Sequence, residues 1–95
     1  MSRAHVYLIA ERIPNCEVFK IGISATPETR VFDLNAGNAR ELYLAHVSPP
    51  LPRAAALDIE RACHSALARW ALGREWFHCP LELGLEALRS HGACA

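Results

Sequence analysis

The sequence lacks an apolar run long enough to cross a membrane. The longest run near its start, Val6 to Ala10, is followed at once by Glu11 and Arg12. A membrane-spanning helix needs roughly 20 apolar residues, and a secretory signal needs a hydrophobic region with a cleavage site. We therefore expect a cytoplasmic chain with no membrane partner and no targeting segment.

The sequence also has no net charge, because ten Lys and Arg side chains balance ten Asp and Glu side chains. No overall field then draws the chain onto a polyanion, which argues against a stand-alone nucleic-acid binder of high affinity. A nuclease is not excluded by this balance, since a local group of a few Arg and Lys side chains can still hold one phosphate.

Close pairs of cysteines are missing as well. The four cysteines lie far apart in the sequence: Cys16, Cys63, Cys79 and Cys94. Without the CxxC spacing of a structural zinc knuckle, we expect reduced thiols. A transition-metal site that combines two of these cysteines with His5 and His78 is a much weaker alternative.

The chain has 95 residues, of which 52% are hydrophobic, and it contains no repeat, linker or low-complexity tract. This length supports one modest core and not two. We expect a single domain over residues 1–95, with a core from about residue 4 to residue 90 and a frayed tail at residues 91–95.

Three strands are predicted from short runs of apolar and β-branched residues. The runs at residues 5–11 and 17–23 are separated by a polar stretch and predict an antiparallel hairpin. A third strand is predicted over residues 41–47, and the proline-rich segment at residues 48–52 ends it.

Three helices are predicted around these strands. The first begins at Thr26-Pro27-Glu28, which offers an N-cap, a proline at the first helical position and an acid in the first turn, and it ends at Gly37. The second follows the prolines, and its apolar residues share one face at spacings of three and four: Ile59, Ala62, Cys63, Ala66, Leu67 and Trp70. The third covers residues 80–89.

These elements predict a small α+β fold in the order β-β-α-β-α-(short extended)-α. Residues 75–78 form the short extended or turn-like segment. We expect a three-stranded antiparallel sheet flanked by helices, with the helices in a single layer.

The predicted hairpin carries two short motifs. His5-Val6-Tyr7-Leu8-Ile9 and Phe19-Lys20-Ile21-Gly22-Ile23-Ser24 resemble the two signatures of the GIY-YIG nuclease superfamily, here reading VYL and KIG. The pattern is most similar to a phage-associated subgroup in which an Arg in the first helix, a Glu, a His and an EWF segment follow. All of these occur here in that order, up to Phe77, so the resemblance rests on an ordered set.

The resemblance implies a role for several residues. It places Tyr7 near the attacking water, Lys20 in the position of the second tyrosine, and Gly22 where the strand approaches the substrate. It also implies that Arg30 contacts the scissile phosphate and that Glu60 holds one Mg²⁺ or Mn²⁺ ion. The remaining residues expected to bind substrate or line the site are His5, Ser24, His64 and Glu75.

Residue chemistry agrees with these roles. Arg30 is always charged and presents a planar fork that matches two phosphate oxygens. Glu60 supplies a hard oxygen ligand, and Mg²⁺ commonly takes only one or two protein carboxylates. On a helical projection, Glu60 falls at the border of the apolar face, and His64 lies one turn further on the same side.

Other assignments stay open at this point. Tyr7 has an ordinary pKa of about 10, so it acts as a base only if Lys20 or a metal-bound water network lowers that value; a desolvated Lys20 is the other candidate base. Trp76 and Phe77 are more often packing residues than a platform for bases. The chain also departs from the family pattern, since the first signature lacks glycine and no counterpart of a late Asn is evident.

Three functions follow as hypotheses. The first is a metal-dependent endonuclease acting on nucleic acid, with DNA favoured over RNA. The second is a catalytically weak or inactive module that binds nucleic acid or protein. The third is a domain that depends on self-association as a homodimer, through an apolar surface formed by Trp70, Trp76 and Phe77.

Overall fold

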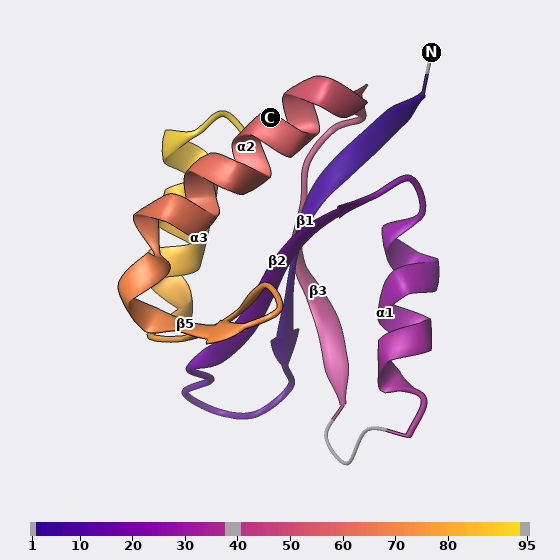
Figure 1. Cartoon of the computed structure of the whole chain (residues 1–95). Coiled ribbons are helices and arrows are strands. Elements are labelled where there is room, and N and C mark those ends of the chain that lie inside the picture. Colours follow the sequence, from indigo (N-terminus) through magenta and orange to yellow (C-terminus); the bar gives the residue numbers. More distant parts are fainter. Residues whose placement is uncertain (1, 38–40, 94–95) are drawn as a thin grey trace.

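The computed structural model describes residues 2–37 and 41–93, which form an α+β fold with one antiparallel sheet (Figure 1). Its strands are β1 (Arg3–Glu11), β2 (Val18–Ser24), β3 (Leu42–Val47), β4 (Leu51–Pro52), β5 (Ala71–Gly73) and β6 (Trp76–His78). Its helices are α1 (Pro27–Asn35), α2 (Arg53–Ala66) and α3 (Leu81–Ser90), with a short 3₁₀ helix at Ala68–Trp70. No helix among the described residues is long and apolar enough to span a membrane.

The central hairpin is confirmed. β1 and β2 pair antiparallel, with Tyr7 opposite Gly22 and Ile9 opposite Lys20. The predicted third strand is also confirmed, because β3 pairs with the other edge of β1. Residues directly opposite one another point to the same face of a sheet, so the register puts Tyr7, Gly22 and Lys20 on one face.

The sheet has six strands, and the prediction of three was wrong. Along the sheet the order is β3-β1-β2-β6-β5, and β4 pairs with the beginning of β1. β4 and β5 were not predicted, and β6 falls within the segment at residues 75–78 that was expected to be short and extended or turn-like; each of the three is only two or three residues long. Alternation of apolar and polar residues is a usable signal only over roughly four to eight residues, so their pairing is set by tertiary contacts.

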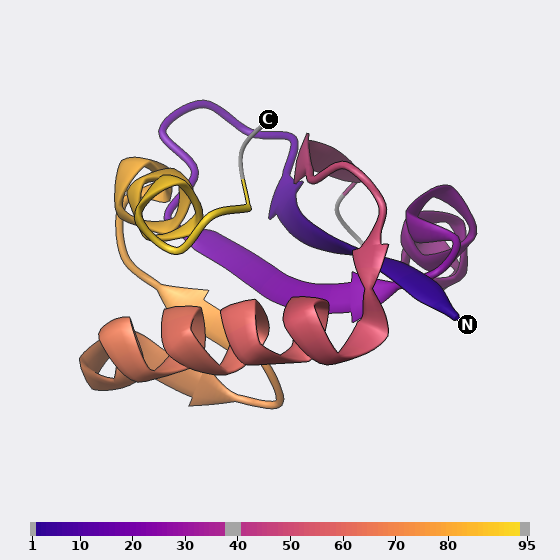
Figure 2. The same cartoon turned by 90° about the horizontal axis from the view of Figure 1, so that it is seen from above.

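The helices occupy both faces of the sheet, which corrects the prediction of a single layer (Figures 1 and 2). On one face, α2 and α3 cover a core that includes Val6, Leu8, Phe19 and Ile21. On the opposite face, α1 packs against a smaller cluster around Tyr7, Ile9 and Leu42. The hairpin strands are therefore apolar on both faces, and this double coverage was not evident from the mixed composition of the α1 sequence.

The first helix begins where predicted, but Thr26 does not cap it. Pro27 occupies the first turn and Glu28 supplies the acid, while the Thr26 side chain makes no capping hydrogen bond. Instead, the Thr26 backbone N–H donates to Ser24 Oγ at 3.0 Å. This contact fixes the loop between β2 and α1, which forms one wall of the site described below.

The segment after α3 is held against the sheet at Ala93, which was expected in a frayed tail. Ala93 is fully buried, its N–H donates to the Leu88 carbonyl, and its own carbonyl lies 2.9 Å from His46 Nε2. The rest of the predicted tail, residues 94–95, lies outside the described residues.

The cysteines that the structure describes are free thiols, Cys16, Cys63 and Cys79; Cys94 falls outside the described part of the chain. Burial raises the pKa of Cys63 to about 11, so its thiol stays neutral and inert at physiological pH. Within residues 2–37 and 41–93, no group of three or more His, Cys, Asp and Glu side chains is arranged to hold a metal ion. The Cys63 and Cys79 thiols belong to the apolar core.

Candidate functional site

Gly22 is the point on which two of the predicted site side chains converge. A Cβ atom at this position would lie 2.6 Å from the Tyr7 hydroxyl and 2.8 Å from Glu75 Oε1. Tyr7 comes from β1 and Glu75 from the turn between β5 and β6, so the missing side chain of a β2 residue makes room for both. The close approach predicted for this glycine is made here by two side chains of the same chain.

Lys20 and Glu75 form an ion pair beside this point. Lys20 Nζ donates to Glu75 Oε1 at 2.9 Å, with 5% of the lysine side chain exposed and 40% of the glutamate side chain exposed. The backbone adds a second link, because the Ile21 N–H donates to the Glu75 carbonyl at 3.2 Å. Glu75 is thus fixed to β2 through its side chain and its main chain.

The turn that presents Glu75 has an unusual backbone. Arg74 and Glu75 join β5 to β6 with φ angles of +52° and +73°. Two-residue hairpin turns with positive φ at both positions favour Asn-Gly, because most side chains are strained in this region. Arg74 and Glu75 are not residues that this turn favours, and the contacts of Glu75 with Lys20 and Ile21 hold the turn in place.

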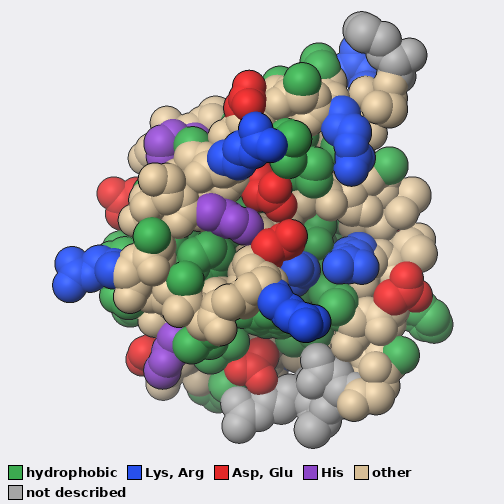
Figure 3. Space-filling model, viewed as in Figure 1, with side chains coloured by type: hydrophobic (Ala, Val, Ile, Leu, Met, Phe, Trp, Pro, Cys, Tyr) green, Lys and Arg blue, Asp and Glu red, His purple; other side chains and the backbone are tan. Residues whose placement is uncertain are grey.

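A cleft of about 540 Å³ opens over these residues. Of the predicted site residues, five line it: Tyr7, Ser24, Arg30, Glu60 and Glu75. They come from β1, β2, α1, α2 and the β5–β6 turn. Acidic, basic and histidine side chains gather along the middle of this face of the molecule (Figure 3). Lys20 and Gly22 lie directly behind the lining, in contact with Glu75.

Arg53 and Thr26 also line the cleft, and the sequence patterns did not identify either of them. Arg53 begins α2 and lies seven residues before Glu60, so the two share one side of the helix after two turns. This spacing of seven residues from Glu60 was the signal in the sequence that could have identified Arg53 as a cleft residue. Arg53 is exposed, and no salt bridge within the described ranges involves its side chain.

The environment of Tyr7 differs from the one expected for a tyrosine base. Burial raises the pKa of Tyr7 above 10, and hydrogen bonding and charge attraction from Arg30 oppose this only in part. The cation that acts on the phenol is therefore Arg30, whereas Lys20 is engaged with Glu75. Tyr7 is only 1% exposed. Because burial raises its pKa, the hydroxyl stays neutral at physiological pH.

Glu60 has a raised pKa, first because it is partly buried and then because the negative charge of Glu75 disfavours its ionised form. His64, Lys20 and Arg61 lower the pKa to a smaller extent. Two carboxylates from different elements thus act on one another across the cleft.

A divalent cation fits this donor set. Glu60 and Glu75 are hard oxygen ligands that repel one another, and a cation between them would relieve that repulsion. Two carboxylates would leave the other coordination positions to water and phosphate oxygens, which is the usual arrangement for Mg²⁺.

The two predicted histidines are placed differently from the other site residues. His64 Nε2 lies 2.8 Å from the Ile21 carbonyl, and because a carbonyl only accepts, this nitrogen carries the proton. The His64 ring also packs edge-on against Phe77, so it ties α2 to the sheet behind Glu60. His5 Nδ1 lies 2.7 Å from the Ser48 carbonyl, and His5 is not among the residues that line the cleft.

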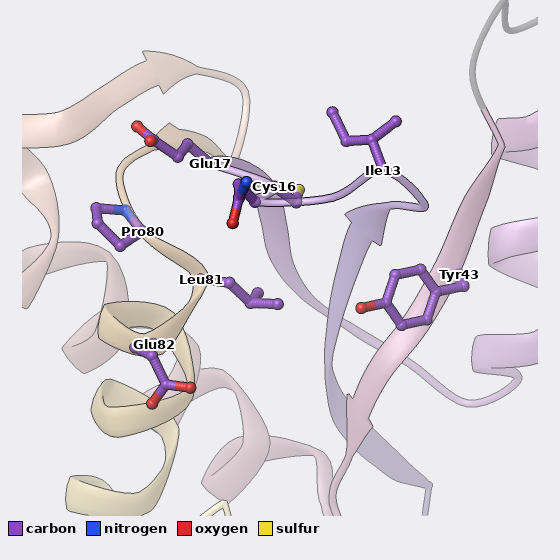
Figure 4. Close-up of a pocket in the computed structure, with 8 residues that line it drawn as sticks. Ile13, Cys16, Glu17, Tyr43, Pro80, Leu81 and Glu82 are labelled. Atoms are coloured by element: carbon purple, nitrogen blue, oxygen red, sulfur yellow. The ribbon is translucent and has the colours of Figure 1, made fainter.

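A second hollow, of about 460 Å³, lies at the other end of the sheet between the β1–β2 loop, β3 and the beginning of α3 (Figure 4). Its lining is mixed: apolar side chains come from Ile13, Cys16 and Leu81, and polar groups from Asn15, Glu17 and Glu82. It contains none of the predicted site residues. Five of the predicted site residues line the cleft around Tyr7 and Glu60 instead.

Comparison with known proteins identifies a family. No curated protein and no solved structure matches the chain. The model of one protein family, the T5orf172 domain, matches residues 4–91, a range that contains every residue of the cleft. This domain is found in phage and bacterial nuclease-like proteins. The chain therefore belongs to the T5orf172 domain family.

Proposed function

We propose that this chain is a divalent-metal-dependent endonuclease domain that hydrolyses a phosphodiester of nucleic acid, with DNA as the favoured substrate. One observation carries the proposal: Tyr7, Arg30, Glu60 and Glu75, from four separate parts of the chain, line one cleft. The resemblance of the hairpin motifs to the GIY-YIG signatures gives independent support, and a nuclease-like role is compatible with the family.

Arg30 is the proposed phosphate-binding residue. Its guanidinium lines the cleft beside the Tyr7 hydroxyl, and its planar set of donors matches the oxygens of a phosphodiester. Charge grows on those oxygens as the phosphate is attacked, so a fixed cation stabilises the transition state more than the ground state.

Glu60 is the proposed metal ligand, with the charge of Glu75 acting on it from the same cleft. A bound Mg²⁺ or Mn²⁺ supplies charge neutralisation at the phosphate and lowers the pKa of a coordinated water. Substituting Glu60 should therefore remove activity without disturbing substrate contacts made by Arg30.

Tyr7 and Glu75 are the proposed groups that orient the attacking water. The neutral Tyr7 hydroxyl can donate and accept a hydrogen bond. Of the two bases considered from the sequence, Tyr7 is disfavoured by its raised pKa, and Lys20 is engaged as a donor to Glu75. We therefore assign proton acceptance to the Glu75 carboxylate, whose Oε1 lies beside the Tyr7 hydroxyl over Gly22.

Nicking of supercoiled plasmid tests this proposal, with and without Mg²⁺ or Mn²⁺. The wild type should nick only with metal, and Glu60→Ala and Arg30→Ala should each lower the rate by at least about 100-fold, a typical loss for a group that stabilises the transition state. If no nucleic acid is cut with either metal, the catalytic proposal is wrong. Metal-independent binding that survives Glu60→Ala would then support the non-cleaving module.

A further inference from the structure

Beside the cleft lies another, more apolar hollow of about 590 Å³, lined by Val18, Leu72, Gly73, Arg74 and Trp76. We propose that it is a subsite for one unpaired nucleobase, which stacks on Trp76 next to the phosphate held in the cleft. The inference rests on the proposed function for its nucleic-acid ligand, and it specifies single-stranded or locally unpaired substrate.

The subsite is continuous with the candidate site. Trp76 is the register partner of Lys20 on the neighbouring strand, and Lys20 is the partner of Ile9. The indole therefore lies on the same face of the sheet as Tyr7 and Lys20. Glu75, which faces the cleft, is the residue directly before Trp76, so a nucleotide bound in one hollow places its neighbour at the other.

Coverage of this face of the sheet is incomplete. α1 packs mainly on β3, with fewer contacts to β1 and β2, and β3 lies at the opposite edge of the sheet from β6 and β5. All three residues of β5 are exposed, and 59% of Leu72 is accessible to solvent. Trp76 is half-buried: it packs against the Tyr7 cluster and also lines the hollow, so part of the indole remains accessible there.

Charge favours a nucleotide over an apolar partner. Arg74 stands at the rim, is exposed, and takes part in no salt bridge between residues that the structure describes. Its backbone is held at a φ of +52°, a strained conformation for an arginine in a turn. An indole for stacking beside an accessible guanidinium for a phosphate is the combination found in grooves that bind single strands.

The test uses the full chain with Trp70→Phe, so that Trp76 is the one remaining tryptophan. Without divalent metal, two probes of equal length are compared: oligothymidylate and an abasic sugar-phosphate oligomer. We expect oligothymidylate to quench Trp76 fluorescence and to bind roughly 5- to 150-fold more tightly than the abasic probe, as one stacked base would give.

Two further variants identify the surface. Leu72→Ser changes an exposed residue of the hollow and should bring the affinity for oligothymidylate close to that for the abasic probe. Phe32→Ser is the matched control, because Phe32 is 75% exposed and belongs to α1 rather than to the hollow; it should leave the preference unchanged.

Several outcomes would overturn the subsite. Equal affinity for the two probes would do so, as would an unchanged preference in Leu72→Ser. A change of Trp76 emission with protein concentration alone would show that a second copy of the chain occupies the hollow. If the base preference is present but metal-dependent cleavage is absent, the subsite stands and the catalytic proposal fails. Cleavage without base preference would instead leave the catalytic proposal standing and remove the subsite.

Discussion

Gly22 determines how closely two side chains of the candidate site approach one another. Its missing Cβ leaves space that the Tyr7 hydroxyl and the Glu75 carboxylate occupy together. The Glu75 oxygen ends a flexible side chain and can withdraw, but Tyr7 is a buried ring whose Cζ would also be only 2.9 Å from an added Cβ. A methyl group at position 22 therefore has to displace the Tyr7 ring and the Glu75 carboxylate, which both belong to the proposed site.

Gly22→Ala should lower both stability and cleavage. We expect a loss of about 1–3 kcal/mol in unfolding free energy, as for other overpacked sites, and strongly reduced activity per folded molecule. Gly84→Ala is the matched control, because a Cβ there meets the Phe19 ring at 2.7 Å, far from the cleft. Urea unfolding and nicking rates should show that Gly84→Ala loses stability alone; equal losses of activity in both variants would contradict this role of Gly22.

Glu60→Gln should stabilise the metal-free protein at neutral pH. The pKa of Glu60 is raised above 4.5, so the folded state binds this proton more tightly than the unfolded chain does. Ionised Glu60 then costs stability above the raised pKa, and this cost disappears as the pH falls below 4.5. The gain should be no more than about 1 kcal/mol, because the cleft is open to water.

Thermal unfolding between pH 4 and pH 8 measures this difference. The two proteins should have the same stability at the acid end and diverge as the pH rises, with the variant the more stable. A wild type that is the more stable protein at neutral pH would show that favourable contacts hold the ionised Glu60, contrary to its raised pKa.

Arg53 is expected to bind a phosphate that is not cleaved. Arg53→Ala should weaken binding to DNA and reduce the slope of log affinity against log salt by about 1, the effect of losing one phosphate contact. The cleavage rate at saturating substrate should stay near that of the wild type. Binding measured at several salt concentrations checks this, and an unchanged slope would remove Arg53 from the site.

At the scale of elements, the β5–β6 hairpin completes the site. It pairs with β2 and carries Glu75 at its turn, where the side chain reaches Lys20 and the main chain reaches Ile21. This hairpin is short and its turn has positive φ at Arg74 and Glu75. Its stability therefore depends on the tertiary contacts that also form the candidate site.

The contribution of the Lys20–Glu75 pair to stability should be separable from its contribution to cleavage. Glu75→Gln leaves an almost fully buried ammonium without its anionic partner, so it should cost about 1–2 kcal/mol. Adding Lys20→Met removes the buried charge and should recover most of this stability, but not activity. A double-mutant cycle by urea unfolding, together with nicking rates, tests both; recovered activity in the double variant would refute a functional role for Glu75.

The sequence predicted the long elements of this fold better than the short ones. Alternation and helical spacing are strong signals in β1, β2, β3 and α2, and those elements were found. β4 and β5 were missed because two or three residues carry no period, and β6 falls within the segment at residues 75–78 that was expected to be short and extended or turn-like. The single layer of helices was wrong because the few apolar residues of α1 do not identify a partner surface. Local sequence patterns therefore predict whether a segment forms a helix or a strand, while its place in the fold depends on contacts with the rest of the chain.

The candidate site was predictable in the same uneven way. Tyr7, Arg30 and Glu60 were indicated by ordered motifs, and all three line the cleft. Glu75 was expected in the site, but its contact with Lys20 could not be singled out from the sequence, because it joins residues far apart in the chain through a turn of unusual backbone. The apolar surface expected from Trp70, Trp76 and Phe77 was wrong: Phe77 is buried, Trp70 packs on the α2–α3 core, and Trp76 lies on the other face.

At the scale of the whole molecule, the balance of positive and negative charge limits how strongly the domain can attract nucleic acid. With a formal net charge of zero, the domain has no long-range attraction to nucleic acid, and affinity has to come from local contacts in the cleft. Self-association as a homodimer stays a prediction, as does the preference for DNA over RNA.

The most direct test of the central claim is a titration of Mn²⁺ against the cleavage rate of one DNA substrate, with Glu60→Gln beside Asp58→Asn. Asp58 is the matched control, because it is an exposed carboxylate on α2 that does not line the cleft. We predict saturable, metal-dependent cleavage by the wild type and by Asp58→Asn, and none by Glu60→Gln at any metal concentration. Cleavage by Glu60→Gln with an unchanged dependence on Mn²⁺ would contradict the assignment of Glu60 as the metal ligand.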